Sequence, residues 1–305
     1  MSTKIRTGTP TVNITMVTWN RVNLTRLCLE RLLSTKLQDY IIHVVDNGST
    51  DETRSYISHL SSIHNNIKVI FLRKNYGVSV AANYGWTLTD SDYYVKLDND
   101  VEILDDNWLD NLINFRERNK EVGLLGYRLL EKHKVTPVYL PSGDVFHEFI
   151  SCGGGLILIP NNIHQQCGFW NEDYGYYGFT DLDYSNRVQI LGCRVGYHFN
   201  EKAARHLGYD FDIYNNQEEL KQNSVHDARK GEKLYLLNKF LFEEKIRSIN
   251  VDRKFLPEQN KNSDISFYLN PKYIPITKLQ NELLAKIKYT KDGDKVRLDF
   301  GMLKF

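Results

Sequence analysis

The N-terminal third of the chain alternates between short apolar runs and longer segments whose apolar residues recur at a helical period. Apolar and β-branched runs bounded by turn-forming residues predict strands, and apolar residues three and four positions apart predict helices. In the segment 23–34, for example, Leu24, Cys28 and Leu32 fall on one helical face. The pattern predicts strands at 11–18, 40–46, 67–72 and 92–98, and helices at 23–34, from about Asp51 to Ser62, and at 78–89.

The order of these elements predicts an α/β fold. Strand–helix units that follow one another place their strands in a parallel sheet with helices on both faces. The run 40–46 (YIIHVVD) is almost continuously apolar, as expected for a strand that is buried on both faces. Ligands of such sheets bind beyond the carboxyl ends of the strands. Asp46 and Asp98 both stand at such ends, so two distant segments are directed toward one crevice.

The fourth predicted strand ends in the acidic triplet Asp98-Asn99-Asp100. Two carboxylates at the tip of an apolar strand are costly to bury unless a positive charge is close to them. The triplet therefore forms either a solvated turn or part of a cation site, and the crevice favours the cation site. A hard divalent cation takes oxygen ligands and bridges phosphate oxygens, so a nucleotide site with a bound metal is expected.

Several other ligand motifs are missing from the places where they would be needed. No G-x-G-x-x-G follows the first strand, and the glycines of the segment 152–160 (CGGGLILIP) precede a strand instead of opening a helix. An EF-hand counted from Asp98 would have Ile103 at its glycine position. The four cysteines form no C-x-x-C pair, which argues against a zinc site and fits free thiols in a reducing cytoplasm.

A series of segments then follows in a fixed order: VTWNR (17–21), VVDNGSTDET (44–53), NYGVSVAANYG (75–85), KLDNDVEI (96–103), GFWNEDYGYYGFTDLDYSNRVQILG (168–192) and ARHLGYD (204–210). Their order and spacing resemble the family 2 glycosyltransferases, and the resemblance covers about residues 11–210. It implies the glycosyltransferase type A fold, with a mainly parallel nucleotide-binding sheet flanked by helices. We therefore expect a catalytic domain at 1–215 and a C-terminal extension at 216–305.

The resemblance implies a nucleotide pocket at the edge of the sheet. Asp46 would accept a hydrogen bond from the imide N–H of the base, which favours uracil or thymine in the donor. Thr18, Arg21 and Asn75 would line the same pocket, and Asp98 would reach the ribose or a metal-bound water. For Asp46 and Asn75 the alternative is a purely structural role in forming turns.

The resemblance also implies a metal. Asp100 would ligate Mg²⁺ or Mn²⁺ on the diphosphate, and His206 in the ARHLG segment would complete the shell. A lone histidine is more often a surface or core residue than a ligand. His226, in SVHDARKGE, is the competing candidate.

On the acceptor side, Asp181 matches the family's catalytic base. It stands at the start of a helix predicted to run to about Leu191, where the helix dipole favours the ionised form. Asp183 cannot share the face of Asp181 and is expected to act at the helix start or indirectly on the substrate. Gly154 and Trp170 are further expected substrate residues, Trp170 as a stacking platform for a sugar ring.

Two positions depart from the family. Thr180 stands where Glu is usual, and Ala82 stands where Arg is common. The preferences of the family for donor and acceptor therefore do not carry over to this chain. Should Asp181 not be the base, Asp183 and Glu172 are the next candidates.

The C-terminal extension has its own composition. From Lys221 to Phe305 there are 18 Lys and Arg against 11 Asp and Glu, whereas the whole chain has a net charge of +1. This basic segment is either a solvated surface or a surface for an anionic partner. Its patterns predict helices within 217–249 and at 276–287, a polar loop at 252–264 and a β-hairpin at 286–300.

Together these features predict an inverting, Mn²⁺- or Mg²⁺-dependent glycosyltransferase. It would move a sugar from a UDP- or dTDP-sugar to a hydroxyl group of a glycan, glycolipid or other polymer, as in polysaccharide biosynthesis. A sugar nucleotidyltransferase, a catalytically silent carbohydrate- or nucleotide-binding module, and a transferase acting on modified nucleic acid are the alternatives. Without a signal peptide or a run of about 18 apolar residues, a cytoplasmic location is expected. Peripheral contact with the inner membrane face and a homodimer contact through the extension are further expectations.

Overall fold

The computed structural model describes the greater part of the chain, and all structural statements below refer to that part. The described residues are 10–36, 39–129, 136–175, 178–207, 238–239, 242, 252–259, 264–274, 278, 288–292 and 295–299. The predicted domain boundary at 215/216, His226, and nearly all of the helices expected at 217–249 and 276–287 lie outside these residues.

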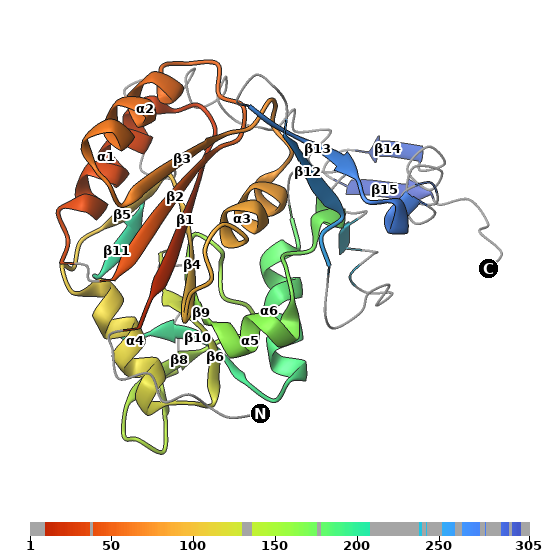
Figure 1. The fold of residues 1–305 in the computed structure, drawn as a ribbon. Helices are drawn as coiled ribbons and strands as arrows, with labels where there is room; N and C mark the ends of the chain where they lie inside the picture. The colour runs from red at the N-terminus through yellow and green to blue at the C-terminus, as the bar shows by residue number, and fades with distance from the viewer. Residues whose placement is uncertain are drawn as a thin grey trace.

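A twisted sheet forms the centre of the molecule (Figure 1). In the described residues its strands are β1 (Val12–Thr18), β2 (Tyr40–Asp46), β3 (Ile67–Phe71), β4 (Tyr93–Asp98), β6 (Val122–Tyr127), β7 (Val138–Tyr139), β8 (Val145–Glu148), β9 (Leu156–Pro160) and β10 (Arg194–His198). Their order is β3-β2-β1-β4-β9-β6-β10-β8-β7. The first four strands are mutually parallel, and β10 is parallel to β6. Strand β9 is antiparallel to β4 and β6, and β8 is antiparallel to β7 and β10. The predicted parallel sheet is confirmed.

Helices cover both faces of this sheet. They are α1 (Val22–Leu33), α2 (Thr53–Ile63), α3 (Val78–Trp86), α4 (Trp108–Arg118), α5 (Asn161–Cys167) and α6 (Thr180–Ile190), with 3-10 turns η1 (Glu172–Tyr174) and η3 (Pro271–Tyr273). Buried residues of α1, α2 and α4 pack in one core on one face, and those of α3, α5 and α6 pack in a second core on the other. Because successive side chains of a strand point to opposite faces, β1 and β4 contribute to both cores.

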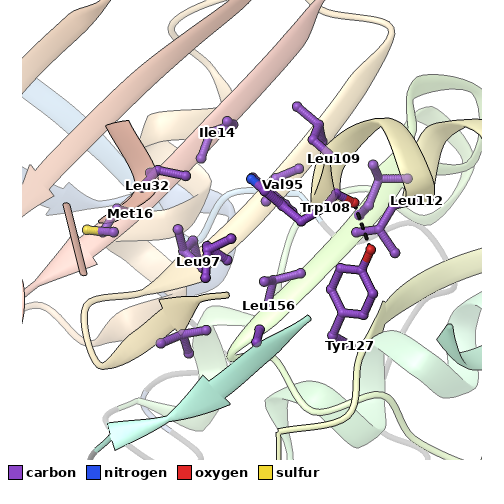
Figure 2. Packing of buried hydrophobic residues seen from close by; sticks show 14 of the residues in the cluster. Ile14, Met16, Leu32, Val95, Leu97, Trp108, Leu109, Leu112, Tyr127 and Leu156 are labelled. Carbon is purple, nitrogen blue, oxygen red and sulfur yellow. Dashed lines mark hydrogen bonds between the residues drawn. The ribbon is translucent and has the colours of Figure 1, made fainter. Parts of the chain in front are cut away.

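Figure 2 shows how the first core is filled around α4. Met16 of β1 and Leu97 of β4 point to the same side of the sheet, and Trp108 of α4 packs with them in the same cluster. The hydroxyl of Tyr127 donates a hydrogen bond of 2.8 Å to the carbonyl of Trp108, so the one polar atom of that ring is satisfied. Burial on both faces explains why the strands read as apolar runs.

A small antiparallel pair lies beside the main sheet. It consists of β5 (Val101–Ile103), directly after the acidic triplet, and β11 (Ala204–His206). In the register of this pair, His206 is opposite Val101. The pairing therefore brings His206 next to the end of β4.

The C-terminal extension contributes two hairpins. One consists of β12 (Phe255–Gln259) and β13 (Ile265–Leu269), and the other of β14 (Lys288–Asp292) and β15 (Lys295–Asp299). The second confirms the hairpin predicted at 286–300. The loop predicted at 252–264 is wrong for residues 255–259, which form β12. This strand obtains its backbone partners from β13, which local polarity does not reveal.

The first hairpin packs on the part of the chain that contains the main sheet, beside α3 (Figure 1). The Phe267 ring meets Tyr76 and Tyr84 edge-on, at centroid distances of 4.9 and 5.4 Å. Leu72 forms a parallel β-bridge with Ile265. In the described ranges no helix has the length and apolar character required to cross a membrane.

Candidate active site

The carboxyl ends of β1, β2 and β4 bring the predicted donor residues to one edge of the sheet. Thr18 is paired with Asp46 in the β1–β2 register, and Val17 is paired with Asp98 in the β1–β4 register. The convergence of Asp46 and Asp98 expected from the strand order is therefore present.

Asp46 is completely buried. Its Oδ1 accepts a hydrogen bond from the Thr18 hydroxyl at 3.3 Å, and its Oδ2 accepts one from the backbone N–H of Ser49 at 3.1 Å. The Arg54 guanidinium lies 3.9 Å from Oδ2. Burial raises the pKa of Asp46, while the hydrogen bonds from Ser49 and the charge of Arg54 act in the opposite direction. The site thus holds a fully buried carboxylate whose polar partners come from β1, from the turn after β2 and from α2.

Asn75 has the turn-forming role that the sequence left open. Its Oδ1 accepts hydrogen bonds from the Asn47 amide at 3.0 Å and from the Gly77 N–H at 2.8 Å. Gly48 adopts φ of +82°, and a Cβ atom there would lie 2.5 Å from the Lys74 carbonyl carbon. The turn after Asp46 and the segment containing Asn75 therefore fit together only with glycine at position 48.

Arg21 lies across the acidic triplet. Its Nη1 donates to Asp100 Oδ2 and its Nη2 donates to Asn99 Oδ1, both at 2.9 Å. The amide of Asn99 donates in turn to the Thr25 hydroxyl at 2.8 Å. Arg21 has a left-handed backbone, with φ of +61°, immediately before α1. The structure thus places Arg21 beside Asp100, the predicted metal residue, and not beside Asp46.

Lys96 was not singled out from the sequence, yet it lies at the centre of the site. Its side chain is buried within β4, and its Nζ donates to Asp98 Oδ1 and to the Gly154 carbonyl, both at 2.6 Å. Partial burial raises the pKa of Asp98, and the Lys96 charge opposes that shift. The signal available in the sequence was a lysine inside the apolar run YYVKLD.

Asp100 and His206 are neighbours, as predicted. Nε2 of His206 lies 3.6 Å from Asp100 Oδ1, and the side chain of Asp100 is only 9% exposed. The described residues contain no group of three or more His, Cys, Asp or Glu side chains arranged to hold a metal. Mg²⁺ and Mn²⁺ in nucleotide sites commonly bind one or two protein groups and complete their shell with phosphate oxygens and water. One carboxylate and one imidazole therefore fit such a cation.

Asp181 faces the same region from the first turn of α6. A Cβ atom added at Gly154 would lie 2.3 Å from Asp181 Oδ1 and 3.3 Å from Lys96 Nζ. The charge of Asp181 also contributes to the raised pKa of Asp98. The Asp181 carboxylate therefore packs directly against Gly154, in the place that a Cβ atom would occupy, and lies close to Lys96.

Two of the expected substrate residues are placed differently. Trp170 is 1% exposed, and its ring packs against Tyr184 and Trp86 at centroid distances of 4.5 and 5.8 Å. The expected open stacking platform is wrong, because Asn83 hydrogen-bonds both the N–H and the carbonyl of Trp170 and draws it into the core. Asp183 is also buried and pairs with Arg187 at 3.1 Å, which gives it a structural role within α6.

Glu172, the reserve candidate for the base, is occupied by structural contacts. Its carboxylate accepts hydrogen bonds from the Asn83 amide and from Arg253 Nε, both at 2.8 Å, and from the Phe255 N–H at 2.7 Å. It is 3% exposed. These contacts leave Asp181 as the candidate carboxylate that packs against Gly154, near Asp98.

The strand order and the acidic groups at the strand ends define a glycosyltransferase of the type A fold. Residues 13–196 match the model of glycosyl transferase family 2, and the chain belongs to that family. The protein is therefore a glycosyltransferase. It is 24% identical over 303 residues to a protein of Haemophilus influenzae called an uncharacterized glycosyltransferase, and the match covers 92% of this chain and 91% of that protein.

Solved structures of glycosyltransferases share the fold. The mannosyltransferase PcManGT from Pyrobaculum calidifontis, in complex with GDP-Man and Mn²⁺, has a TM-score of 0.60 and 15% identity, covering 91% of this chain and 70% of its own. GalNAc-T7 with UDP, GalNAc and Mn²⁺ has a TM-score of 0.54 and 13% identity, covering 65% of this chain and 43% of its own. S. aureus TarS (residues 1–349) has a TM-score of 0.52 and 14% identity, covering 77% and 73%.

Proposed function

We propose that the protein is an inverting, divalent-metal-dependent glycosyltransferase that uses a UDP- or dTDP-sugar and a polymeric or lipid-linked hydroxyl acceptor. The observation that carries the proposal is the meeting of Asp98 on the donor side and Asp181 on the acceptor side around Gly154. A base and a donor-binding group held close together suit direct transfer from one bound substrate to another.

The donor base would bind at Asp46. The Asp46 carboxylate accepts hydrogen bonds from Thr18 and Ser49, and the imide N–H of uracil or thymine is a matching donor for a further acceptor position of an ionised carboxylate. Thr18 and the Asn75 turn form the walls next to it. The ribose would lie toward Asp98 at the neighbouring strand end.

Asp100 and His206 are the residues that would hold the cation. A bound Mn²⁺ or Mg²⁺ would supply positive charge for the departing diphosphate. The presence of Mn²⁺ with the mannosyltransferase and with GalNAc-T7 supports this proposal. Arg21, which donates to Asp100, adds a fixed positive charge at the same place.

Asp181 would be the general base. It takes the proton from the acceptor hydroxyl while the hydroxyl oxygen forms a bond to the anomeric carbon of the sugar. The bond from that carbon to the diphosphate oxygen breaks on the opposite side, so the configuration inverts. The leaving nucleoside diphosphate carries away the electron pair.

The acceptor and the location are proposed from the charge of the C-terminal extension. The excess of Lys and Arg between residues 221 and 305 suits an anionic polymer or the headgroups of a membrane face. We propose a cytoplasmic enzyme of glycan synthesis that uses such an acceptor, with the extension also available for a homodimer contact.

The test measures Mn²⁺-dependent binding of UDP and slow hydrolysis of UDP-sugars. Wild-type protein should bind UDP more tightly with Mn²⁺ and should release UDP from at least one UDP-sugar, which a pure binding module would not do. Asp100→Ala should lose the Mn²⁺-dependent part of binding and keep its melting temperature. Calorimetry that shows unchanged Mn²⁺-dependent UDP binding in Asp100→Ala would refute the metal role.

A further inference from the structure

A cavity of about 570 Å³ lies at the amino end of β4, away from the candidate active site. Tyr93, the first residue of β4, lines this cavity, whereas Asp98 stands at the other end of the same strand. Helix α4 contributes Ile113 and Arg116 to the lining. Cavities of this size bind small organic molecules in other proteins. The cavity is therefore separate from the donor and acceptor residues described above.

Arg116 differs from the other lining residues in having a buried charge. It is 4% exposed, and its Nε and Nη1 are closed off from solvent with no hydrogen-bond partner in the described part of the chain. Its Nη2 has no partner there either but is not closed off, so the guanidinium meets the cavity at this end. Buried polar groups normally have a partner, because an unpaired buried charge is costly. An acceptor in the cavity would remove that cost.

The carboxylates that line the cavity have partners other than this guanidinium. The Tyr93 hydroxyl donates to Glu117 Oε1, and Lys120 Nζ lies 2.7 Å from Glu117 Oε2. Asp92 Oδ2 accepts hydrogen bonds from the N–H and from the hydroxyl of Thr11, both at 2.9 Å. Both acidic groups are thus engaged, and the unpaired positive charge at the cavity wall favours an anionic ligand.

The remaining polar lining suits a sugar. It consists of side-chain amides, which belong to Asn114, Asn161, Asn162 and Gln165. An amide has both N–H donors and a carbonyl acceptor, and a sugar hydroxyl can pair with either. An arginine binds carboxylate or phosphate oxygens through two N–H groups at once. The combination therefore suits a sugar unit that carries one of these two anionic groups.

We infer that the cavity is a second ligand site, which binds a sugar bearing a phosphate or carboxylate group, with Arg116 as the residue that binds the anion. The inference does not depend on the roles proposed for Asp46, Asp100 or Asp181. Because the lining residues stand at the other end of β4, a sugar bound there leaves the donor site free. The enzyme would thus contact an anionic sugar outside the site of transfer.

The test is calorimetry with glucose 6-phosphate, glucuronate and glucose, with and without saturating UDP and Mn²⁺ to fill the donor site. Wild-type protein should bind one of the two anionic sugars under both conditions and should bind glucose more weakly. The anionic sugar that binds more tightly identifies the anionic group. Arg116→Met should weaken its binding about 10- to 100-fold, as for one lost hydrogen bond to a charged group. Arg118→Met, which removes an exposed arginine from the same helix, is the matched control and should leave the affinity unchanged.

Melting temperatures separate ligand binding from a structural effect. Methionine replaces a guanidinium that has no partner in the described residues, so ligand-free Arg116→Met should keep or raise the melting temperature. The bound sugar should raise the melting temperature of the wild type by mass action and leave that of Arg116→Met unchanged.

Three results would overturn the inference: no binding of either anionic sugar to the wild type, the same affinity in Arg116→Met, or equal affinity for inorganic phosphate and glucose 6-phosphate. Should Arg116→Met not fold, Arg116→Lys takes its place, because it keeps the charge but has a single nitrogen. It should weaken binding about tenfold, and wild-type affinity in this variant would likewise overturn the inference.

Discussion

Replacing Gly154 by alanine is expected to slow sugar transfer by about 10²-fold while donor binding stays nearly unchanged. The added Cβ would lie 2.3 Å from Asp181 Oδ1 and 3.1 Å from its Cγ. The carboxylate must then retreat by about 1 Å to reach an ordinary contact distance. A misplacement of about 1 Å can cost about 10² in rate, which sets the expected loss.

The same geometry predicts a small effect on stability. The atom that must move is the end of a side chain on the first helical turn, so a change of side-chain torsion relieves the overlap at about 0.5–1.5 kcal/mol. The neighbouring substitution Gly153→Ala is a matched control, because its Cβ would meet only the Tyr197 hydroxyl at 3.5 Å, an ordinary contact. It should retain nearly full activity.

The assay is release of UDP from the accepted UDP-sugar in the presence of Mn²⁺, with acceptor or with water as the nucleophile. Calorimetric UDP affinity and the melting temperature are measured alongside. Full activity of Gly154→Ala would refute the importance of the Asp181 position against Gly154. An equal loss of transfer rate in Gly153→Ala and Gly154→Ala would show that the loop tolerates no side chain. The displacement of Asp181 would then not explain the loss.

Three further predictions concern Asp181, Lys96 and His198. Asp181→Asn keeps shape but removes the base, so the transfer rate should fall by about 10²–10⁴-fold with little change in UDP affinity, and a near wild-type rate would place the base elsewhere. Lys96→Met removes the buried ammonium from Asp98, whose side chain is 32% exposed, so urea unfolding should show a loss of about 2–3 kcal/mol, below that of a fully buried pair. Burial lowers the pKa of His198 to about 4. The unfolded chain therefore takes up that proton first, and the stability present above pH 6.5 is lost toward pH 4 by about 1.4 kcal/mol per pH unit. His198→Phe should reduce that slope in unfolding measured between pH 7 and pH 5, and an unchanged slope would contradict this expectation.

The strands and helices of the nucleotide-binding half could be predicted because their signals are local. Strand β2 has the predicted bounds, 40–46. The ends of α1 and α2 lie one or two residues from their predicted positions. The position of Asp46 and Asp98 followed from strand polarity alone, since parallel strands end at one edge. The placement of His206 depended on the family resemblance, because its pairing with the residue after Asp100 joins segments far apart in sequence.

The residues that sequence reasoning placed wrongly are those whose surroundings come from distant segments. Trp170 stands in an aromatic, glycine-rich stretch that reads as a sugar-binding loop, but the Asn83 amide on α3 fixes its backbone inside the core. Lys96 was not predicted as a site residue, because a single lysine in a strand is ordinary. Its two hydrogen-bond acceptors, Asp98 and the Gly154 carbonyl, are brought to it by the fold. Residues 255–259 read as a polar loop until their strand partner, β13, is known.

The anchoring of Glu172 by Arg253 has a consequence for the order in which the protein is made. Arg253 leaves the ribosome 81 residues after Glu172, which at about 5–20 residues per second is a delay of about 4–16 s. During that interval the nascent catalytic part has a carboxylate in its interior without its cation. The final packing of η1 must therefore wait for the extension, and a chain that stalls during translation of the extension has this turn incompletely packed.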